Sequence, residues 1–229
     1  MPIAKLGASV YRLNDLLIDE YGHHEWRPHR DPLSELVLTI LSQHTSDINS
    51  GRAFSNLVER FENWEDVRDA DPLGIASAIN CAGLGQIKSV RIKAILEEIT
   101  SRLPLSDGDG RMDISFLAQL PMVEAKAWLR SLPGVGPKTA ACVLLFSLQQ
   151  PALPVDTHVH RLARRLGLVD AKASPERTQD ELEALVPPES VYEFHINLIA
   201  HGRRVCKSQR PRCGECILAG LCPSYGVVV

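Results

Sequence analysis

The sequence of 229 residues predicts an all-α fold. Apolar residues recur at helical spacing along the whole chain, whereas the alternating apolar and polar runs of half-buried strands are scarce. Gly, Pro, Asn or Asp occupies most of the breaks between these periodic segments, as expected where helices end. The composition, 45% hydrophobic and 23% charged, is that of a globular protein that can bury one large core or two small ones.

The individual helices follow from local signals. The segment Ser9–Tyr21 places Val10 and three leucines on one face. Asp31 is an N-cap followed by a proline at the first helical position, and it opens a helix over Leu33–Ser42. The same periodicity predicts helices at Ile48–Phe61, Gly74–Ile79, Lys88–Ser101, Ile114–Leu120, Val123–Ser131, Pro137–Leu148, Val159–Leu166, Pro175–Leu185 and Val191–Arg203. The segment Pro104–Gly110 predicts a loop.

Charge is distributed unevenly, although the net charge is only −3. Acidic residues gather between positions 59 and 71, and arginines stand at positions 161, 164 and 165. A further basic run without any acid contains Arg203, Arg204, Lys207, Arg210 and Arg212. This pattern predicts a basic face that could bind a polyanion; the alternative is a set of solvated surface charges.

The hydropathy pattern predicts no membrane segment. The longest apolar stretch, Ala140–Phe146, is far too short to cross a bilayer, and the N-terminus lacks the apolar core of a secretory signal. We therefore expect a cytoplasmic protein, associated with the nucleoid if the source is bacterial.

A glycine-rich turn joins the predicted helices Val123–Ser131 and Pro137–Leu148. Gly134 and Gly136 permit positive φ and leave no side chain between the backbone and a ligand. The proline suits the first helical turn, where free N–H groups and the positive helix end favour a phosphate. The turn therefore predicts a phosphate-binding hairpin; the alternative is an ordinary turn with a glycine cap.

Lys138 follows this turn and is a candidate nucleophile, because a neutral lysine amine attacks an electrophilic carbon and forms a Schiff base. The helix that it opens advances about 18 Å. Seven extended residues, Gln149–Val155, can span about 23 Å in return, so Asp156 can come back to the level of Lys138. The alternatives are an ordinary exposed lysine and an aspartate that only caps the next helix.

Four cysteines, Cys206, Cys213, Cys216 and Cys222, lie within seventeen residues. Thiolates this close together would repel one another unless a metal centre held them, and both zinc and iron–sulfur clusters accept four cysteines. Zinc sites commonly use two short Cys pairs, whereas only one is present, so the spacing favours a cluster. Lys207, Arg210 and Arg212 lie on the loop that the metal would make rigid, where they could contact phosphates.

Together, the hairpin, the lysine, the aspartate and the cysteine spacing resemble the endonuclease III family of helix–hairpin–helix DNA glycosylases. The resemblance runs from about Leu33 to Cys222, and the 6-2-5 cysteine spacing is the [4Fe–4S] pattern of that family. It implies that Lys138 is the nucleophile and Asp156 the catalytic aspartate. It also implies that Gln43 fills the gap left by an extruded nucleotide and that Leu84 intrudes into the base stack as a wedge. Without the resemblance, Leu84 reads as a buried core leucine.

The resemblance implies two helical domains that bind DNA. Residues 25–135 would form a six-helix bundle, residues 1–24 and 136–229 a cluster domain, and residues 123–148 the helix–hairpin–helix motif. The expected protein is a monomer that acts on double-stranded DNA with damaged bases or abasic sites.

The implied activity is that of a bifunctional glycosylase and abasic-site lyase for oxidised pyrimidines such as thymine glycol, with strand cleavage by β-elimination. One alternative is a thymine or uracil mismatch glycosylase, because Gly85-Gln86-Ile87 departs from the wedge loop of many members. The other is a non-catalytic iron–sulfur module that binds DNA.

Overall fold

The computed structural model describes residues 3–103 and 111–227, which contain helices, turns and loops but no strand. The predicted all-α fold is therefore confirmed, while the predicted loop Pro104–Gly110 lies outside the described residues. The α-helices are α1 (Ile3–Tyr21), α2 (Pro32–Leu41), α3 (Asp47–Arg60), α4 (Trp64–Asp69), α5 (Pro72–Ala78), α6 (Gly85–Arg102), α7 (Met122–Arg130), α8 (Pro137–Leu148), α9 (Thr157–Arg165), α10 (Pro175–Leu185) and α11 (Val191–Arg204). Short 3₁₀ turns are η1 (Asn80–Ala82), η2 (Ser115–Gln119), η3 (Pro188–Ser190), η4 (Cys213–Glu215) and η5 (Ala219–Leu221).

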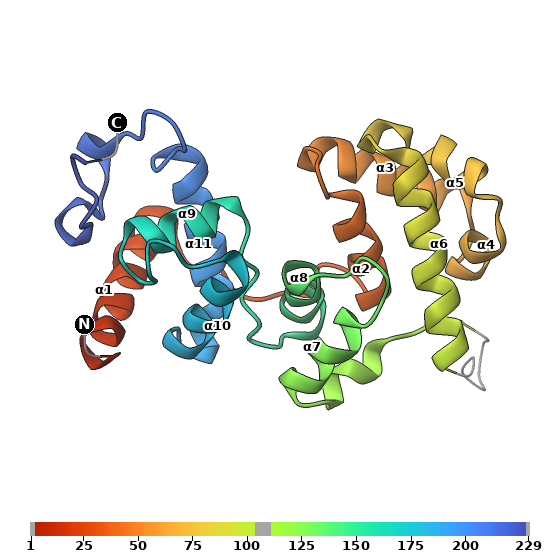
Figure 1. The fold of residues 1–229 in the computed structure, drawn as a ribbon, viewed down its shortest axis with the longest axis horizontal. Coiled ribbons are helices and arrows are strands. Elements are labelled where there is room, and N and C mark those ends of the chain that lie inside the picture. Colours follow the sequence, from red (N-terminus) through yellow and green to blue (C-terminus); the bar gives the residue numbers. More distant parts are fainter. Residues whose placement is uncertain (1–2, 104–110, 228–229) are drawn as a thin grey trace. The chain divides into compact units, whose positions relative to one another are not determined.

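The chain divides into two compact units, one of residues 28–150 and the other of residues 1–27 together with 151–229. The first unit holds α2 to α8. Within it α8 lies beside α2 and α7, and α6 packs against α4 and α5 (Figure 1). None of the described helices is long and apolar enough to cross a membrane.

The division falls after α8, whereas the sequence prediction placed it at residue 135 and gave α8 to the cluster domain. The reason is packing, because α8 buries every residue from Thr139 to Leu145 and its main partner is α2. A helix that is apolar on nearly all sides belongs to the core of the unit that surrounds it.

The second unit joins the N-terminal helix to the C-terminal part of the chain. In it α11 packs against both α9 and α1. Glu193 of α11 accepts hydrogen bonds from the N–H of His24 at 2.9 Å and from the ring of His23 at 3.0 Å, which fixes the end of α1. The four cysteines follow α11.

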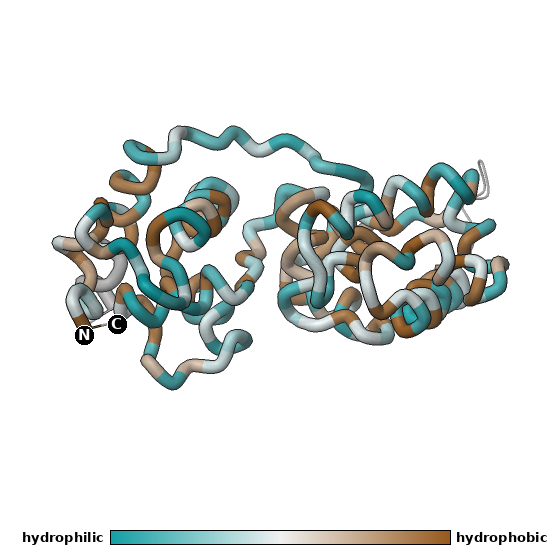
Figure 2. Tube along the Cα trace, turned by 90° about the horizontal axis from the view of Figure 1, so that it is seen from above, coloured by the Kyte–Doolittle hydropathy of each residue, from teal (hydrophilic) through white to brown (hydrophobic). Residues whose placement is uncertain are grey.

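Helix starts agree with the expected caps. Asp31 accepts a hydrogen bond from the N–H of Ser34, and Pro32 takes the first helical position, as predicted for α2. Individual helices contain both hydrophobic and hydrophilic residues, as amphipathic helices do (Figure 2). One predicted helix was wrong, because Ile114–Leu120 contains the 3₁₀ turn η2 instead of an α-helix. The helix α4 was not predicted.

Candidate functional site

The predicted site residues fall into both units. Lys138 belongs to the unit of residues 28–150 and Asp156 to the other, so their meeting stays a prediction. With Lys138 lie Gln43, Leu84, Gly134 and Gly136; with Asp156 lie Lys207, Arg210, Arg212 and the four cysteines.

The turn between α7 and α8 has the backbone geometry of the predicted hairpin. Gly134 has a φ of +73°, a backbone conformation that favours glycine, and a Cβ there would lie 2.4 Å from Nε of Arg91, so a side chain at 134 would also have to displace that arginine. Gly136 has an ordinary φ of −95°, and no atom would lie within 4 Å of its Cβ. The fold would therefore accept a side chain at position 136. Because glycine has none, the start of α8 is open to a ligand.

The N-terminus of α8 keeps its donors available. Among the described residues, no side chain caps this helix end. The first main-chain bond of the helix runs from the N–H of Ala140 to the carbonyl of Gly136 at 3.0 Å. The first N–H groups of a helix have no partner within it, and Pro137 has no N–H at all. The free donors at this end are therefore the N–H groups of Lys138 and Thr139, where the helix dipole is positive. This arrangement suits a phosphate group.

Lys138 is the second residue of α8, and its side chain is exposed. Its neighbour Thr139 is buried. The amine is therefore accessible to a molecule bound at the helix end, as a nucleophile must be.

Gln43 lies in the turn that follows α2 and is held from two sides. Its Oε1 accepts a hydrogen bond from Nη1 of Arg91 at 2.7 Å, and its Nε2 lies 3.5 Å from Oγ1 of Thr139. These contacts place Gln43 beside the start of α8. No local pattern in the sequence marks Arg91, because the contacts of this side chain with residues 43 and 134 arise only in the folded chain.

Leu84 projects from the turn before α6. Its side chain is 54% exposed, so the alternative of a buried core leucine is wrong. The residue has φ 53° and ψ 32°, a left-handed conformation that costs a residue with a side chain roughly 1–2 kcal/mol. An apolar side chain held outward on a strained turn is the geometry that a wedge requires; that role stays a prediction.

Asp156 is the N-cap of α9, as the sequence predicted. Its Oδ1 accepts hydrogen bonds from the N–H groups of His158 and Val159, each at 2.8 Å. Neither of these bonds uses the second carboxylate oxygen, so capping does not exclude another role for the side chain.

The four cysteines line one pocket, formed also by Arg165, His201 and Leu218 among others. Within the described part of the chain, no group of three or more His, Cys, Asp or Glu side chains is arranged to hold a single ion. Four cysteine side chains that line one pocket are the ligand set of an iron–sulfur cluster. The residues present therefore fit a [4Fe–4S] cluster.

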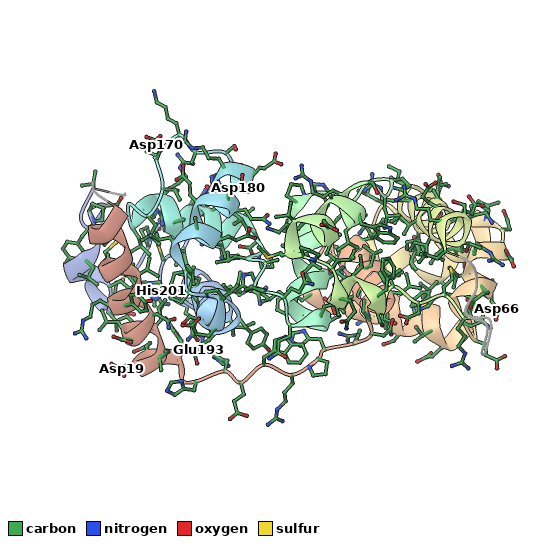
Figure 3. All side chains as sticks on the ribbon, turned by 90° about the horizontal axis from the view of Figure 1, so that it is seen from below. Asp19, Asp66, Asp170, Asp180, Glu193 and His201 are labelled. Carbon is green, nitrogen blue, oxygen red and sulfur yellow. The ribbon has the colours of Figure 1, made fainter. Side chains whose placement is uncertain are left out.

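Two basic side chains contact the sulfur atoms. Nη1 of Arg165 lies 3.3 Å from Sγ of Cys206, and Nε2 of His201 lies 3.4 Å from Sγ of Cys216. The other ring nitrogen of His201 lies 2.9 Å from the hydroxyl of Tyr21, and Figure 3 shows this histidine beside α1. Burial lowers the pKa of His201 to about 4 and raises the pKa of the free Cys216 thiol.

The basic residues separate into two groups. Arg161 and Arg165 turn toward residues 206–222, the cluster loop, and donate to its main-chain carbonyls. Nε of Arg161 lies 2.9 Å from the carbonyl of Cys206, and Nη1 of Arg165 lies 2.7 Å from the carbonyl of Lys207. Lys207, Arg210 and Arg212 are exposed on the loop. Arg212 also lies 3.6 Å from Glu215. Arg161 and Arg165 therefore brace the loop, whereas Arg164 of α9 is exposed like Lys207, Arg210 and Arg212. The exposed residues are the ones that can face a polyanion.

Comparisons with known proteins agree with this arrangement. Residues 37–188 match the model of the HhH-GPD superfamily of base excision DNA repair proteins, and residues 206–222 match the iron–sulfur binding domain of endonuclease III. The chain is 36% identical over 195 residues to endonuclease III of Thermotoga maritima, covering 85% of this chain and 84% of the relative.

Two further comparisons extend this likeness. The chain is 39% identical over 176 residues, 77% of its length, to an Arabidopsis thaliana protein named “Putative DNA glycosylase”, of which the match spans 58%. A solved structure of a trapped endonuclease III–DNA covalent intermediate matches with a TM-score of 0.78 at 26% identity, over 96% of both chains.

Proposed function

The chain belongs to the endonuclease III family of the HhH-GPD superfamily of base excision DNA repair proteins, and from this membership we propose that it is a bifunctional DNA glycosylase and abasic-site lyase. Its partner is double-stranded DNA that contains a damaged base or an abasic site. The observation that carries the proposal is the exposed amine of Lys138 at an uncapped helix end, behind a glycine that the fold does not require.

Lys138 supplies the nucleophile in the proposed reaction. The target nucleotide leaves the base stack, and Nζ of Lys138 attacks C1′ of its sugar. The bond from C1′ to the base breaks, and the base departs with the bonding electrons and takes up a proton. The C1′–O4′ bond of the sugar then breaks, O4′ takes up a proton that Nζ releases, and the opened sugar stays joined to Lys138 as a Schiff base. Loss of a C2′ proton expels the 3′ phosphate by β-elimination, and water releases the enzyme.

The remaining residues bind and orient the DNA. N–H groups at the start of α8 hold a phosphate, while Gln43 and Leu84 occupy the space around the extruded nucleotide. Asp156 supplies a carboxylate that stabilises positive charge on the sugar. The cofactor is a [4Fe–4S] cluster, which Cys206, Cys213, Cys216 and Cys222 would hold. When bound, it ties together the loop that presents the exposed basic residues.

Oxidised pyrimidines, such as thymine glycol, are the proposed substrates. The resemblance to the endonuclease III family implies this class, and the solved structure of a trapped endonuclease III–DNA covalent intermediate supports covalent chemistry. The segment Gly85-Gln86-Ile87 departs from the wedge loop of many family members. It directly follows Leu84, near which the extruded base and the base opposite it would lie.

A set of matched duplexes tests the proposal. Thymine-glycol and abasic-site duplexes should be cleaved, and the product should carry the 3′ end of β-elimination. Faster base removal from G·T or G·U duplexes would instead assign a mismatch glycosylase. Binding to all duplexes without turnover would leave only a DNA-binding module and overturn the proposal.

A further inference from the structure

Lys88 is among the largest of the almost fully buried side chains, with 2% of its surface exposed. Its ammonium donates to the carbonyl of Leu41 at 2.7 Å and to the carbonyl of Ala82 at 2.9 Å. A buried lysine is costly unless its donors are satisfied, so these two carbonyls fix where Nζ lies. Burial also excludes Lys88 as an alternative amine nucleophile.

The two carbonyls belong to the two segments that carry the proposed DNA-inserting residues. Leu41 ends α2, two residues before Gln43, and Ala82 ends η1, two residues before Leu84. One ammonium therefore joins the Gln43 turn to the Leu84 turn, through a carbonyl forty-seven residues before Lys88 and another six residues before it.

Arg91 adds a second link one turn further along α6. It donates to the side chain of Gln43 at 2.7 Å, and it packs so closely against Gly134 that a Cβ there would overlap it. The start of α6 thus bears the exposed Leu84. Within its first two helical turns, Lys88 holds the end of α2, and Arg91 contacts both Gln43 and Gly134 of the hairpin.

We propose that Lys88 and Arg91 are positioning residues that set the spacing between Leu84 and Gln43, so that both side chains enter the base stack together. This inference rests on the proposed function, because it concerns how the protein opens a DNA duplex. Fixing two inserting side chains before binding removes the entropy cost of ordering them on the DNA.

A purely structural role for Lys88 predicts a different outcome, and α6 contains a matched control. Lys93 lies on the same helix and donates to two main-chain carbonyls, those of Arg68 and Ala70, at the end of α4. It thus repeats the chemistry of Lys88 without touching the segments that carry Gln43 and Leu84. Lys88→Met and Lys93→Met each remove two main-chain contacts, and Lys93→Met also removes the ion pair of Lys93 with Glu97 at 3.6 Å.

The test uses the full-length protein with its cluster and a duplex that carries a tetrahydrofuran abasic analogue opposite 2-aminopurine. Insertion of both side chains unstacks 2-aminopurine, so saturating wild-type protein should raise its fluorescence. Lys88→Met should lose most of this rise and bind the duplex about tenfold more weakly. Lys93→Met should keep the wild-type rise and affinity, even if its melting temperature falls as much as that of Lys88→Met.

Arg91→Met is the second variant and carries the test if Lys88→Met does not fold, since Arg91 is only half-buried. It should also lose the fluorescence rise. The slope of log affinity against log salt should not change, whereas loss of a direct phosphate contact would flatten it by about 0.9. A full rise with Lys88→Met or Arg91→Met, or an equal loss with Lys93→Met, would overturn the inference. If the wild type neither bound the analogue nor cleaved lesion DNA, the proposed function itself would fail and the inference with it.

Discussion

Asp156 combines a structural role with a proposed chemical one, and a single substitution separates them. Asparagine keeps an oxygen that can accept from His158 and Val159, so Asp156→Asn should cap α9 nearly as well. It removes the negative charge, and base removal should slow by about 10²–10⁴. Asp156→Ala should lose about 1 kcal/mol of stability in addition. Thermal unfolding and single-turnover glycosylase assays measure the two effects, and wild-type turnover by Asp156→Asn would remove the carboxylate from the mechanism.

The two hairpin glycines should respond differently to alanine. Gly134→Ala forces a side chain into a φ of +73° and into Arg91, so the protein should lose at least about 1 kcal/mol of stability. Gly136→Ala meets neither obstacle and should fold normally, yet it should weaken DNA binding because its methyl group stands where a phosphate approaches. Unfolding midpoints and DNA titrations distinguish the pair. Unchanged DNA affinity in Gly136→Ala would place the phosphate elsewhere.

At the scale of the element, α2 contains a carboxylate that costs stability. Glu35 is buried, its Oε2 has no hydrogen-bond partner within the described residues, and Nη1 of Arg30 lies 3.9 Å away. Burial raises the pKa of Glu35 above the ordinary 4.5, despite the opposing effect of Arg30. The folded state therefore binds this proton more tightly than the unfolded state, so stability falls as pH rises from 4.5 through the folded pKa.

Glu35→Gln should abolish this pH dependence. At pH 8 the variant should be more stable than the wild type by on the order of 1 kcal/mol, and the difference should vanish near pH 4.5. Denaturant unfolding of both proteins across this range provides the measurement. A difference that stayed constant with pH would show that the carboxylate is ionised in the fold without cost.

The elements also show how far local sequence signals reach. Caps and periodicity predicted most helices within a few residues, because both depend on neighbours in the chain. The helix α4 was missed because it has six residues and buries only Val67, which is too little for a periodic pattern. The boundary after α8 depends on packing against α2, and the roles of Lys88 and Arg91 depend on partners more than forty residues away. Lys138 as a candidate nucleophile, Asp156 as a helix cap and the cysteine loop could be predicted from the sequence because each is a local motif.

At the scale of the whole molecule, a net charge of −3 does not attract DNA, so binding must depend on local clusters of basic side chains. Log affinity should fall with log salt by roughly 0.9 for each phosphate neutralised. Replacing the exposed Lys207, Arg210 and Arg212 with alanine should flatten that slope. Lys172→Ala, which removes an exposed lysine outside the cluster loop, should leave it unchanged. Titrations at several salt concentrations decide the matter, and equal slopes in wild type and triple variant would exclude the loop from the interface.

The central claim is that Lys138 forms the covalent link to DNA, and borohydride trapping tests it most directly. Reduction of a Schiff base gives a stable adduct, so wild-type protein should cross-link to abasic or thymine-glycol duplexes. Lys138→Ala should give no adduct while it still binds DNA, and Lys93→Met should cross-link like the wild type. If Lys138→Ala were trapped as efficiently as the wild type, another amine, such as the N-terminal one, would be the nucleophile and the mechanism would be wrong.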